Sequence, residues 1–160
     1  MDLFEAIVQN DVSTVENIIK EQLKKKPTDI ELWVKLCLTE LQFPFEDYES
    51  ALNCIYKIYK LSPNNINALI LEAGIKWHSF GMIEKQLYDR LDNVNVYDIQ
   101  KKAIIVYLQS LYYRYQKDVD NEKKLLEKSI SLYGEFVYPY KALGHIFRYE
   151  FKIQKSKKII

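Results

Sequence analysis

Apolar side chains recur along most of the chain at steps of three and four residues, the spacing that places them on one side of an α-helix. The clearest case lies between Trp33 and Pro63, where two apolar stripes flank a turn at Phe43-Pro44-Phe45. Because the second stripe stops at a proline, which cannot continue a helix, this segment is predicted to form two antiparallel helices. Similar pairs are expected before and after it, so the whole pattern indicates an array of helix pairs.

Polar residues between the stripes indicate where the other helices begin and end. Asp11 or Ser13 can cap a helix that ends in three lysines, and Thr28 and Asp29 cap the next one. Helices are expected over residues 2–9, 12–26, 30–41, 46–60, 63–80, 82–91, 97–116 and 121–132, with a closing helix around residues 140–147. The chain has only four glycines and four prolines, which disfavours an all-β fold with its many tight turns.

Residue spacings in two of these helices resemble the tetratricopeptide repeat. Ala51, Ile55, Ile58 and Pro63 are separated by four, three and five residues, the steps that this repeat shows in its second helix and terminating proline. The closing helix is similar to the first helix of the repeat, in which an aromatic residue, leucine, glycine and a second aromatic residue follow at steps of three, one and three. Here those positions are Tyr140, Leu143, Gly144 and Phe147.

The equivalent positions of successive first helices recur with a nearly constant period. These positions are Trp33, Leu69, Val106 and Tyr140. Successive members are 36, 37 and 34 residues apart, close to the family period of about 34. Departures from the pattern include Glu72 in place of leucine, and Gln109 and Ser110 where leucine and glycine are usual. The chain therefore resembles a degenerate tetratricopeptide array.

This resemblance implies a fold class and a domain division. The expected fold is all-α, a right-handed α-α superhelix (a tetratricopeptide-like solenoid) of about four helix pairs plus a closing helix. One helical repeat domain is expected over residues 1–152, followed by a basic C-terminal tail over residues 153–160.

Charge, hydropathy and cysteine content restrict the partners, the cellular location and the redox state that are expected. The formal net charge is +1, so the electrostatic potential of the whole chain does not favour nucleic acid or an anionic membrane as the partner. The first residues lack a basic start and a continuous apolar run, and no stretch approaches membrane-spanning length, so a cytoplasmic location is expected. Cys37 and Cys54 occupy inward-pointing positions and are expected to be reduced core thiols, with a disulfide between them as the less favoured alternative.

The sequence predicts neither an enzyme, a metal site nor a cofactor. His78 and His145 lie in different repeats, and neither has a second histidine or a cysteine at metal-ligand spacing. Acidic residues at 46–47 and 118–120 fall at predicted helix starts, where capping explains them better than acid–base catalysis does. No glycine-rich phosphate loop or nucleophile elbow is present.

Tyrosines crowd the C-terminal half, where a core alone would more often use leucine. The resemblance implies that the side of each first helix turned away from its packing seam lines an inner, concave wall. On that basis the expected partner-binding residues are Trp77, His78, Tyr107, Leu111, Arg114, Tyr115, Tyr138, Lys141, His145, Arg148 and Tyr149. Tyrosine beside arginine is the composition of binding hot spots. The alternative, that these tyrosines pack between helices with their hydroxyls at the surface, stays open.

Together these observations predict a non-catalytic protein-binding module. The expected partner is another protein, either a toxin domain or a peptide segment with acidic groups, held on the aromatic and basic wall. Two settings stay open: an adaptor or scaffold, or a dedicated inhibitor such as a bacterial immunity protein that neutralises a cognate toxin, for example a contact-dependent inhibition nuclease. RNA binding is a lesser alternative, because tyrosines beside Arg114, Lys141, Arg148 and the lysine-rich end can stack bases and neutralise phosphates.

Overall fold

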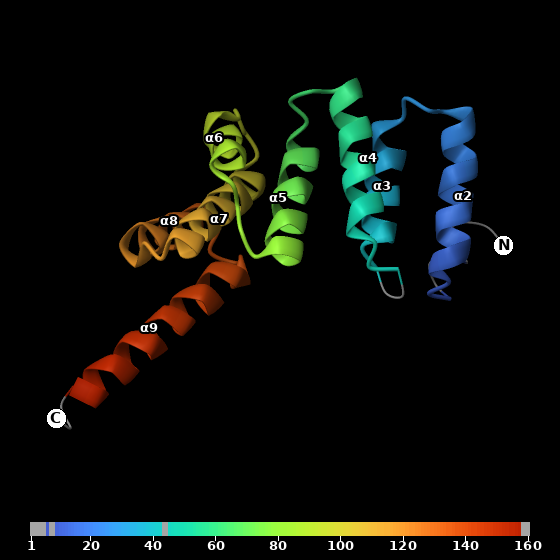
Figure 1. The fold of residues 1–160 in the computed structure, drawn as a ribbon. Helices are drawn as coiled ribbons and strands as arrows, with labels where there is room; N and C mark the ends of the chain where they lie inside the picture. The colour runs from blue at the N-terminus through green and yellow to red at the C-terminus, as the bar shows by residue number, and fades with distance from the viewer. Residues whose placement is uncertain (1–5, 7–8, 43–44, 158–160) are drawn as a thin grey trace. The chain divides into compact units, whose positions relative to one another are not determined.

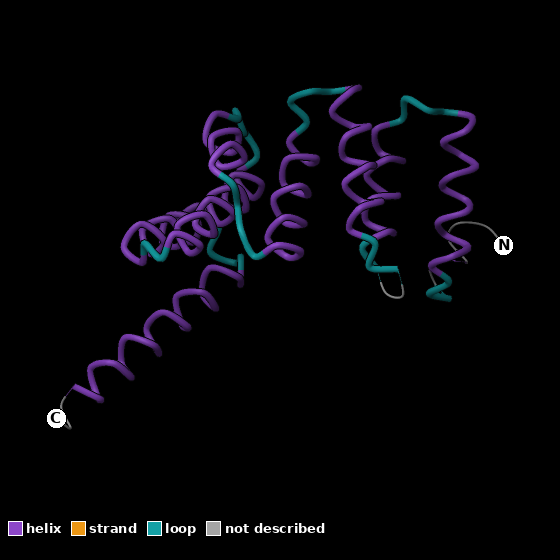
Figure 2. The backbone as a smooth tube through the Cα atoms, viewed as in Figure 1, coloured by secondary structure: helices purple, strands orange, loops and turns teal. Residues whose placement is uncertain are grey.

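All regular structure in the part of the chain that the structure describes is α-helical. The computed structural model describes residues 6, 9–42 and 45–157. Figures 1 and 2 show helices joined by short connections, which confirms the predicted all-α class. The helices are α2 Val12–Lys25, α3 Ile30–Glu40, α4 Tyr48–Leu61, α5 Ile66–Phe80, α6 Lys85–Asn93, α7 Ile99–Gln116, α8 Val119–Leu132 and α9 Val137–Lys157. Of the helix predicted over residues 2–9, the structure describes only Ala6, which is helical, and Gln9, which lies in a turn; the rest of it and the turn residues Phe43 and Pro44 lie outside the described residues.

Contacts within the chain divide it into two compact units. The first is Met1–Ile75 and the second is Lys76–Ile160, so the boundary falls inside α5. In helical repeat proteins each helix pair contacts mainly its neighbours along the chain. A division into units that are local in sequence is expected for this reason.

An aspartate caps the start of several helices. In each case its carboxylate accepts a hydrogen bond from the backbone N–H three residues further on, at N–O distances of 2.8 to 3.2 Å. The caps of α2, α3, α4, α7 and α8 are Asp11, Asp29, Asp47, Asp98 and Asp118. This selects Asp11 over Ser13 and shows Asp29 as the cap of α3, and it confirms that Asp47 and Asp118 serve as caps.

Several helix boundaries differ from the sequence prediction. The helices α4 and α7 begin at Tyr48 and Ile99, two residues later than expected, and α9 spans Val137–Lys157 where a helix around residues 140–147 was expected. The helix α8 begins at Val119, before the predicted Asn121, because Asp118 supplies its cap. The helix α5 begins at Ile66 and not at Pro63, because the Asn65 side chain accepts a hydrogen bond of 3.0 Å from the N–H of Ala68. The helix α6 begins at Lys85, where residues 82–84 were also expected to be helical.

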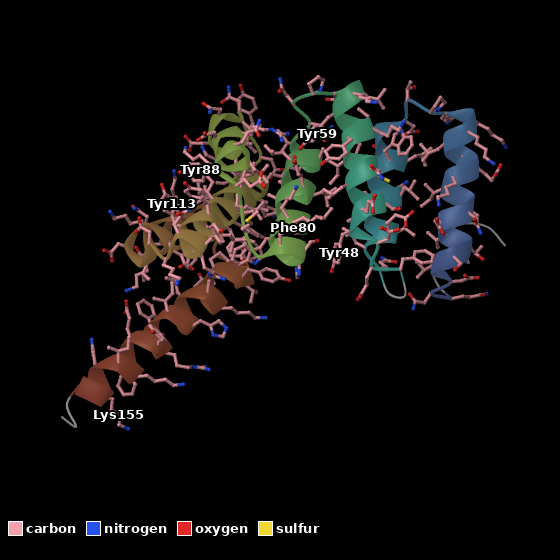
Figure 3. The ribbon with its side chains drawn as sticks, in the orientation of Figure 1. Tyr48, Tyr59, Phe80, Tyr88, Tyr113 and Lys155 are labelled. Atoms are coloured by element: carbon pink, nitrogen blue, oxygen red, sulfur yellow. The ribbon has the colours of Figure 1, made fainter. Side chains whose placement is uncertain are left out.

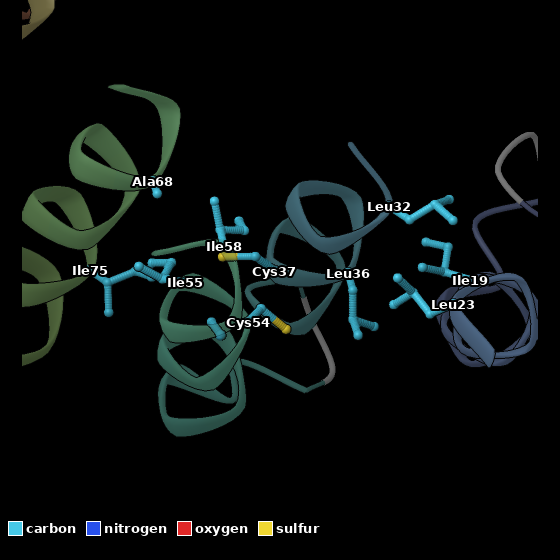
Figure 4. Packing of buried hydrophobic residues seen from close by; sticks show 11 residues of the cluster. Ile19, Leu23, Leu32, Leu36, Cys37, Cys54, Ile55, Ile58, Ala68 and Ile75 are labelled. Carbon is cyan, nitrogen blue, oxygen red and sulfur yellow. The ribbon is translucent and has the colours of Figure 1, made fainter. Parts of the chain in front are cut away.

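The first unit is held together by one apolar cluster that α2, α3, α4 and α5 share (Figure 4). Its buried members are Ile19, Leu23, Leu32, Leu36, Cys37, Ala51, Cys54, Ile55, Ile58, Ala68 and Ile75. Ala51, Ile55 and Ile58, which carry the tetratricopeptide spacing in α4, are 0% exposed. The spacing read from the sequence therefore identified the packed side of this helix.

Glu72 departs from the family pattern because a tyrosine on the neighbouring helix binds it. Glu72 is 8% exposed, and the Tyr59 hydroxyl donates a hydrogen bond of 2.7 Å to its carboxylate. A buried carboxylate is tolerated where a polar group satisfies it. Tyr59 and Glu72 thus replace an apolar contact between α4 and α5 with a polar one.

The two cysteines of the first unit are free and buried, as predicted. Burial raises the pKa of both the Cys37 and the Cys54 thiol to about 12, so very little thiolate exists at pH 8. We expect no reaction of the folded protein with dithionitrobenzoate over minutes, and reaction of both thiols in concentrated urea. Fast reaction of two thiols in the native state would contradict the buried placement.

In the second unit α7 is the central helix. It packs against α6 and α8, and α8 also packs against α9. Small side chains line the seam between α7 and α8: Ala103, Ser110 and Ser129 are 0% exposed, and the Ser129 hydroxyl donates to the Ala103 carbonyl at 2.7 Å. Ser110, where the family usually has glycine, donates its own hydroxyl to the Tyr107 carbonyl at 2.6 Å. Its polarity is thereby satisfied within the helix.

None of the described helices combines the length and the apolar character that crossing a membrane would require.

Candidate functional site

The predicted partner-binding residues all lie in the second unit, on the last turns of α5 and along α7 and α9. Regular helical spacing sets their directions: residues separated by three, four or seven positions share one side of a helix. Tyr107 and Arg114 follow this rule on α7, with Tyr115 next to Arg114, and Tyr138, His145 and Tyr149 follow it on α9. What each of them can contribute depends on the neighbours that it meets.

Tyr107 and Tyr138 belong to a cluster of aromatic rings where α9 begins. The Tyr107 ring lies 5.3 Å from that of Phe136, edge to face, and 6.0 Å from that of Tyr138. Phe136 and Tyr138 are 5.7 Å apart, and the Lys141 ammonium lies 5.8 Å from the centre of the Tyr138 ring. Tyr107 is half-buried and burial raises its pKa, whereas Tyr138 is 60% exposed. The cluster therefore anchors Tyr107 and presents Tyr138 to the surface.

Arg114 is committed to a partner inside the unit. Its Nε donates a hydrogen bond of 2.7 Å to the Glu122 carboxylate, which is only 4% exposed, and its guanidinium lies 5.7 Å from the centre of the Trp77 ring. A carboxylate that is removed from water in this way requires a cation to balance its charge. Arg114 thus serves first to connect α7 with α8, and its charge is largely neutralised.

A cleft of about 500 Å³ opens between the end of α7, the start of α8 and the side of α9. Figure 1 shows α9 diverging from α8 toward its C-terminal end. The residues that line the cleft are Arg114, Val119, Asp120, Glu122, Ala142, His145, Ile146, Tyr149, Glu150 and Ile153. Three of these, Arg114, His145 and Tyr149, were predicted from the sequence, so the structure brings them together.

The sequence reasoning missed several residues of the cleft and of the aromatic cluster. Ile153 lies one turn beyond Tyr149 on α9, and continuing the four-residue step would have found it. Val119 is the first residue of α8, and Phe136 directly precedes α9. Both lie outside the helices that the sequence predicted, so the helical spacing did not point to them. Only tertiary packing places them beside the predicted residues.

One predicted wall residue is wrong. Leu111 is 1% exposed and belongs to the packed interior of the second unit, so it cannot contact a partner on the surface. The spacing placed it on the same side of α7 as Tyr107, but α7 is covered on more than one side, and a large apolar side chain in such a helix is buried.

The remaining predicted residues are accessible to different degrees. Trp77 is half-buried under Arg114, while His78 and Tyr115 are exposed in the last turns of α5 and α7. Lys141, His145 and Arg148 are exposed along α9, and Tyr149 is 67% exposed. The accessible part of the predicted set is therefore concentrated on α9.

Other tyrosines of this half serve packing. The rings of Tyr88, Tyr112 and Tyr113 lie between α6 and α7, with centres 4.7 to 5.7 Å apart, and the hydroxyls of Tyr88 and Tyr113 are 3.3 Å apart (Figure 3). Both readings of the tyrosine-rich sequence thus apply, to different residues: Tyr112 and Tyr113 pack between helices, whereas Tyr138 and Tyr149 face solvent.

Among the described residues, no group of three or more histidine, cysteine, aspartate and glutamate side chains is placed to hold a metal ion. Three of the charged groups of the cleft have ion-pair partners, one of them outside the cleft. Arg114 binds Glu122, and Lys123 of α8 binds Glu150. The surface offers aromatic area and cations, which are means of recognition.

No model of a known protein family matches the sequence, and no curated protein matches it. Solved structures do match the fold. Two crystal structures of MamA align with TM-scores of 0.72 and 0.70, at 19% and 20% identity, and the alignments cover 99% and 98% of this chain and 90% and 82% of those chains. A MamA RS-1 ArsTM double mutant aligns with a TM-score of 0.74 at 17% identity, over 98% of this chain and 85% of that one. MamA is a tetratricopeptide-like helical repeat protein, so the likeness confirms the predicted class of helical solenoid.

Proposed function

We propose that this chain is a non-catalytic protein-binding module, and that it holds an extended or helical segment of a partner protein on the α9 side of its second unit. The observation that carries the proposal is the exposure of Tyr138 and Tyr149, at 60% and 67%, together with the cleft of about 500 Å³ that Tyr149 lines. Large rings that are left in water on one side of a helix give much contact area and lose few rotamers on binding.

The charges of this surface favour a partner with acidic groups. Lys141 and Arg148 are exposed on the same helix as the two tyrosines. Arg114, which the sequence also suggested for this role, is already paired with Glu122. Charge contacts with the partner are therefore assigned to Lys141 and Arg148.

The fold supports the proposal in a general way. Tetratricopeptide-like arrays present extended surfaces for binding other macromolecules. A cytoplasmic location stays a prediction. The choice between a scaffold and an inhibitor of a toxin also stays a prediction, since it depends on the identity of the partner. RNA binding stays the lesser alternative, and the salt dependence of nucleic-acid binding would distinguish it.

The test uses a photo-crosslinking amino acid in place of Tyr149 to capture the native partner from cells, with the same residue in place of Tyr56 as a control. Tyr56 lies on α4 in the first unit and is 47% exposed, so it matches Tyr149 in chemistry but not in place. The affinity of the captured partner is then measured for the unlabelled variants. Tyr149→Ala should weaken binding by roughly 30-fold, about 2 kcal/mol, as expected for a hot spot.

Two further results are expected. Tyr56→Ala should bind like the parent chain, and Lys141→Glu should weaken binding of an acidic partner. The proposal would be wrong if Tyr149→Ala and Tyr56→Ala bound the partner equally well, or if the crosslinker captured the partner only from position 56. Circular dichroism of each variant shows that the helices are intact.

A further inference from the structure

The helix α9 has the pattern of a first helix, but the side that a second helix would cover is exposed. Leu143 of its tetratricopeptide signature is buried against α8, whereas Tyr140 and Phe147 are 49% and 52% exposed. Phe151, one turn further, is 64% exposed. Steps of seven and four residues place these three rings on one side of the helix, and together they form an aromatic stripe.

Equivalent positions elsewhere in the chain are covered. Leu69 and Val106, which correspond to Tyr140 in the 34- to 37-residue register, are 5% and 4% exposed, and Trp33 is half-buried. Seven residues on, the counterparts of Phe147 are Glu40, Lys76 and Tyr113, and each of these is buried or half-buried. In α9 alone among these first helices, both positions are open.

Cations lie on both sides of this stripe. On the α8 side, the Lys123 ammonium is 5.2 Å from the centre of the Phe147 ring, and it also pairs with Glu150. On the other side, Arg148 and Lys155 follow Phe147 and Phe151 by one and four residues, and both are exposed. Figure 3 shows Lys155 near the C-terminal end of α9. Lys141 and Lys152 of α9 are also exposed and basic, and the acidic Glu150 is paired with Lys123.

We propose that the stripe of Tyr140, Phe147 and Phe151 binds an acidic amphipathic helix of a partner protein. Apolar side chains of the incoming helix would cover the three rings, and its flanking carboxylates would meet Arg148 and Lys155, because Lys123 is already paired with Glu150. A second copy of this chain fits poorly, because pairing two α9 helices would bring their basic side chains together.

The aromatic residues of this surface are distinct from those in the proposed function, and Arg148 borders both surfaces. Tyr138, His145 and Tyr149 are offset from Tyr140 and Phe147 by about half a turn of the helix, so they point to the opposite side of α9. The two surfaces can therefore be disabled separately, and failure of one assignment leaves the other standing.

The experiment measures binding of a designed helical peptide to the full chain. The probe is a fluorescein-labelled peptide of about 18 residues with leucines at positions i, i+3, i+4 and i+7 and glutamates on the flanks. One control peptide has the same composition in scrambled order, and a second has lysine in place of each glutamate. We expect the first peptide alone to raise the fluorescence anisotropy at micromolar to submillimolar protein, and added salt to weaken that binding.

Variants locate the contact. Phe147→Ala with Phe151→Ala should weaken binding at least tenfold, whereas Tyr138→Ala with Tyr149→Ala should leave it unchanged. The proposal is overturned if the glutamate peptide does not bind, if the lysine peptide binds as well, or if the Phe147/Phe151 variant binds like the parent chain. A concentration-dependent dimer that this variant abolishes, seen by sedimentation, would replace the acidic helix with a second copy.

Discussion

Replacing Arg114 by methionine is expected to lower the free energy of unfolding by about 3 kcal/mol. The substitution leaves the Glu122 carboxylate, 4% exposed, without the guanidinium that now lies 2.7 Å from it. Removing one member of a buried ion pair costs more than the pair itself contributes, because the remaining charge stays out of water. The 34% exposure of the arginine side chain places the expected loss at the lower end of the usual range. Urea unfolding followed by circular dichroism measures it.

The double variant Arg114→Met with Glu122→Leu is the matched control. Removing both charges and filling the space with apolar atoms should restore most of the lost stability. If the free energy of unfolding of Arg114→Met lay within about 0.5 kcal/mol of that of the parent chain, the ion pair would contribute little to stability. The same result matters for binding studies, because an Arg114 variant that loses affinity would first have to be shown to be folded.

Replacing Ile55 by alanine should destabilise the first unit by about 3 kcal/mol, within the range of 2 to 5 kcal/mol found for removing large apolar side chains from cores. Ile55 is 0% exposed and lies within the cluster that α2, α3, α4 and α5 share. Alanine removes three carbon atoms there, and the rigid helices around the site can close the resulting cavity only in part. The shift of the urea midpoint at constant slope gives the change in stability.

The neighbouring residue provides the control for this prediction. Tyr56 is 47% exposed on the outer side of α4, so Tyr56→Ala should change stability by no more than about 0.5 kcal/mol. Similar losses for the two variants would mean that the buried cluster is misplaced by one residue along α4. That error would also invalidate the tetratricopeptide spacing of Ala51, Ile55 and Ile58.

The sequence predicted the helices well because their signals are local. Apolar steps of three and four residues and the aspartates before them act within a few positions, so both can be read directly from the chain. Boundaries were wrong where a cap was misjudged, as at Asp118, whose side chain starts α8 two residues earlier than expected. At α6 an extended Glu84 delays the helix, although Ile83 is already buried.

The candidate site was less predictable because its character depends on contacts between distant residues. The spacing correctly placed His145 and Tyr149 on one side of α9, and both line the cleft. It could not show that Arg114 would meet Glu122, that Phe136 would support Tyr107, or that Leu111 would be covered. Each of these outcomes follows from how α7, α8 and α9 pack, which one helical period does not encode.

The recurrent aspartate caps suggest how such a chain can change in evolution. The information that starts a helix lies within the four residues from Asp29 to Leu32, or from Asp118 to Asn121, and does not refer to the rest of the chain. Duplicating or deleting one helix pair therefore leaves the start signals of all other pairs intact. The number of helix pairs can therefore change while each remaining pair keeps its own start signal.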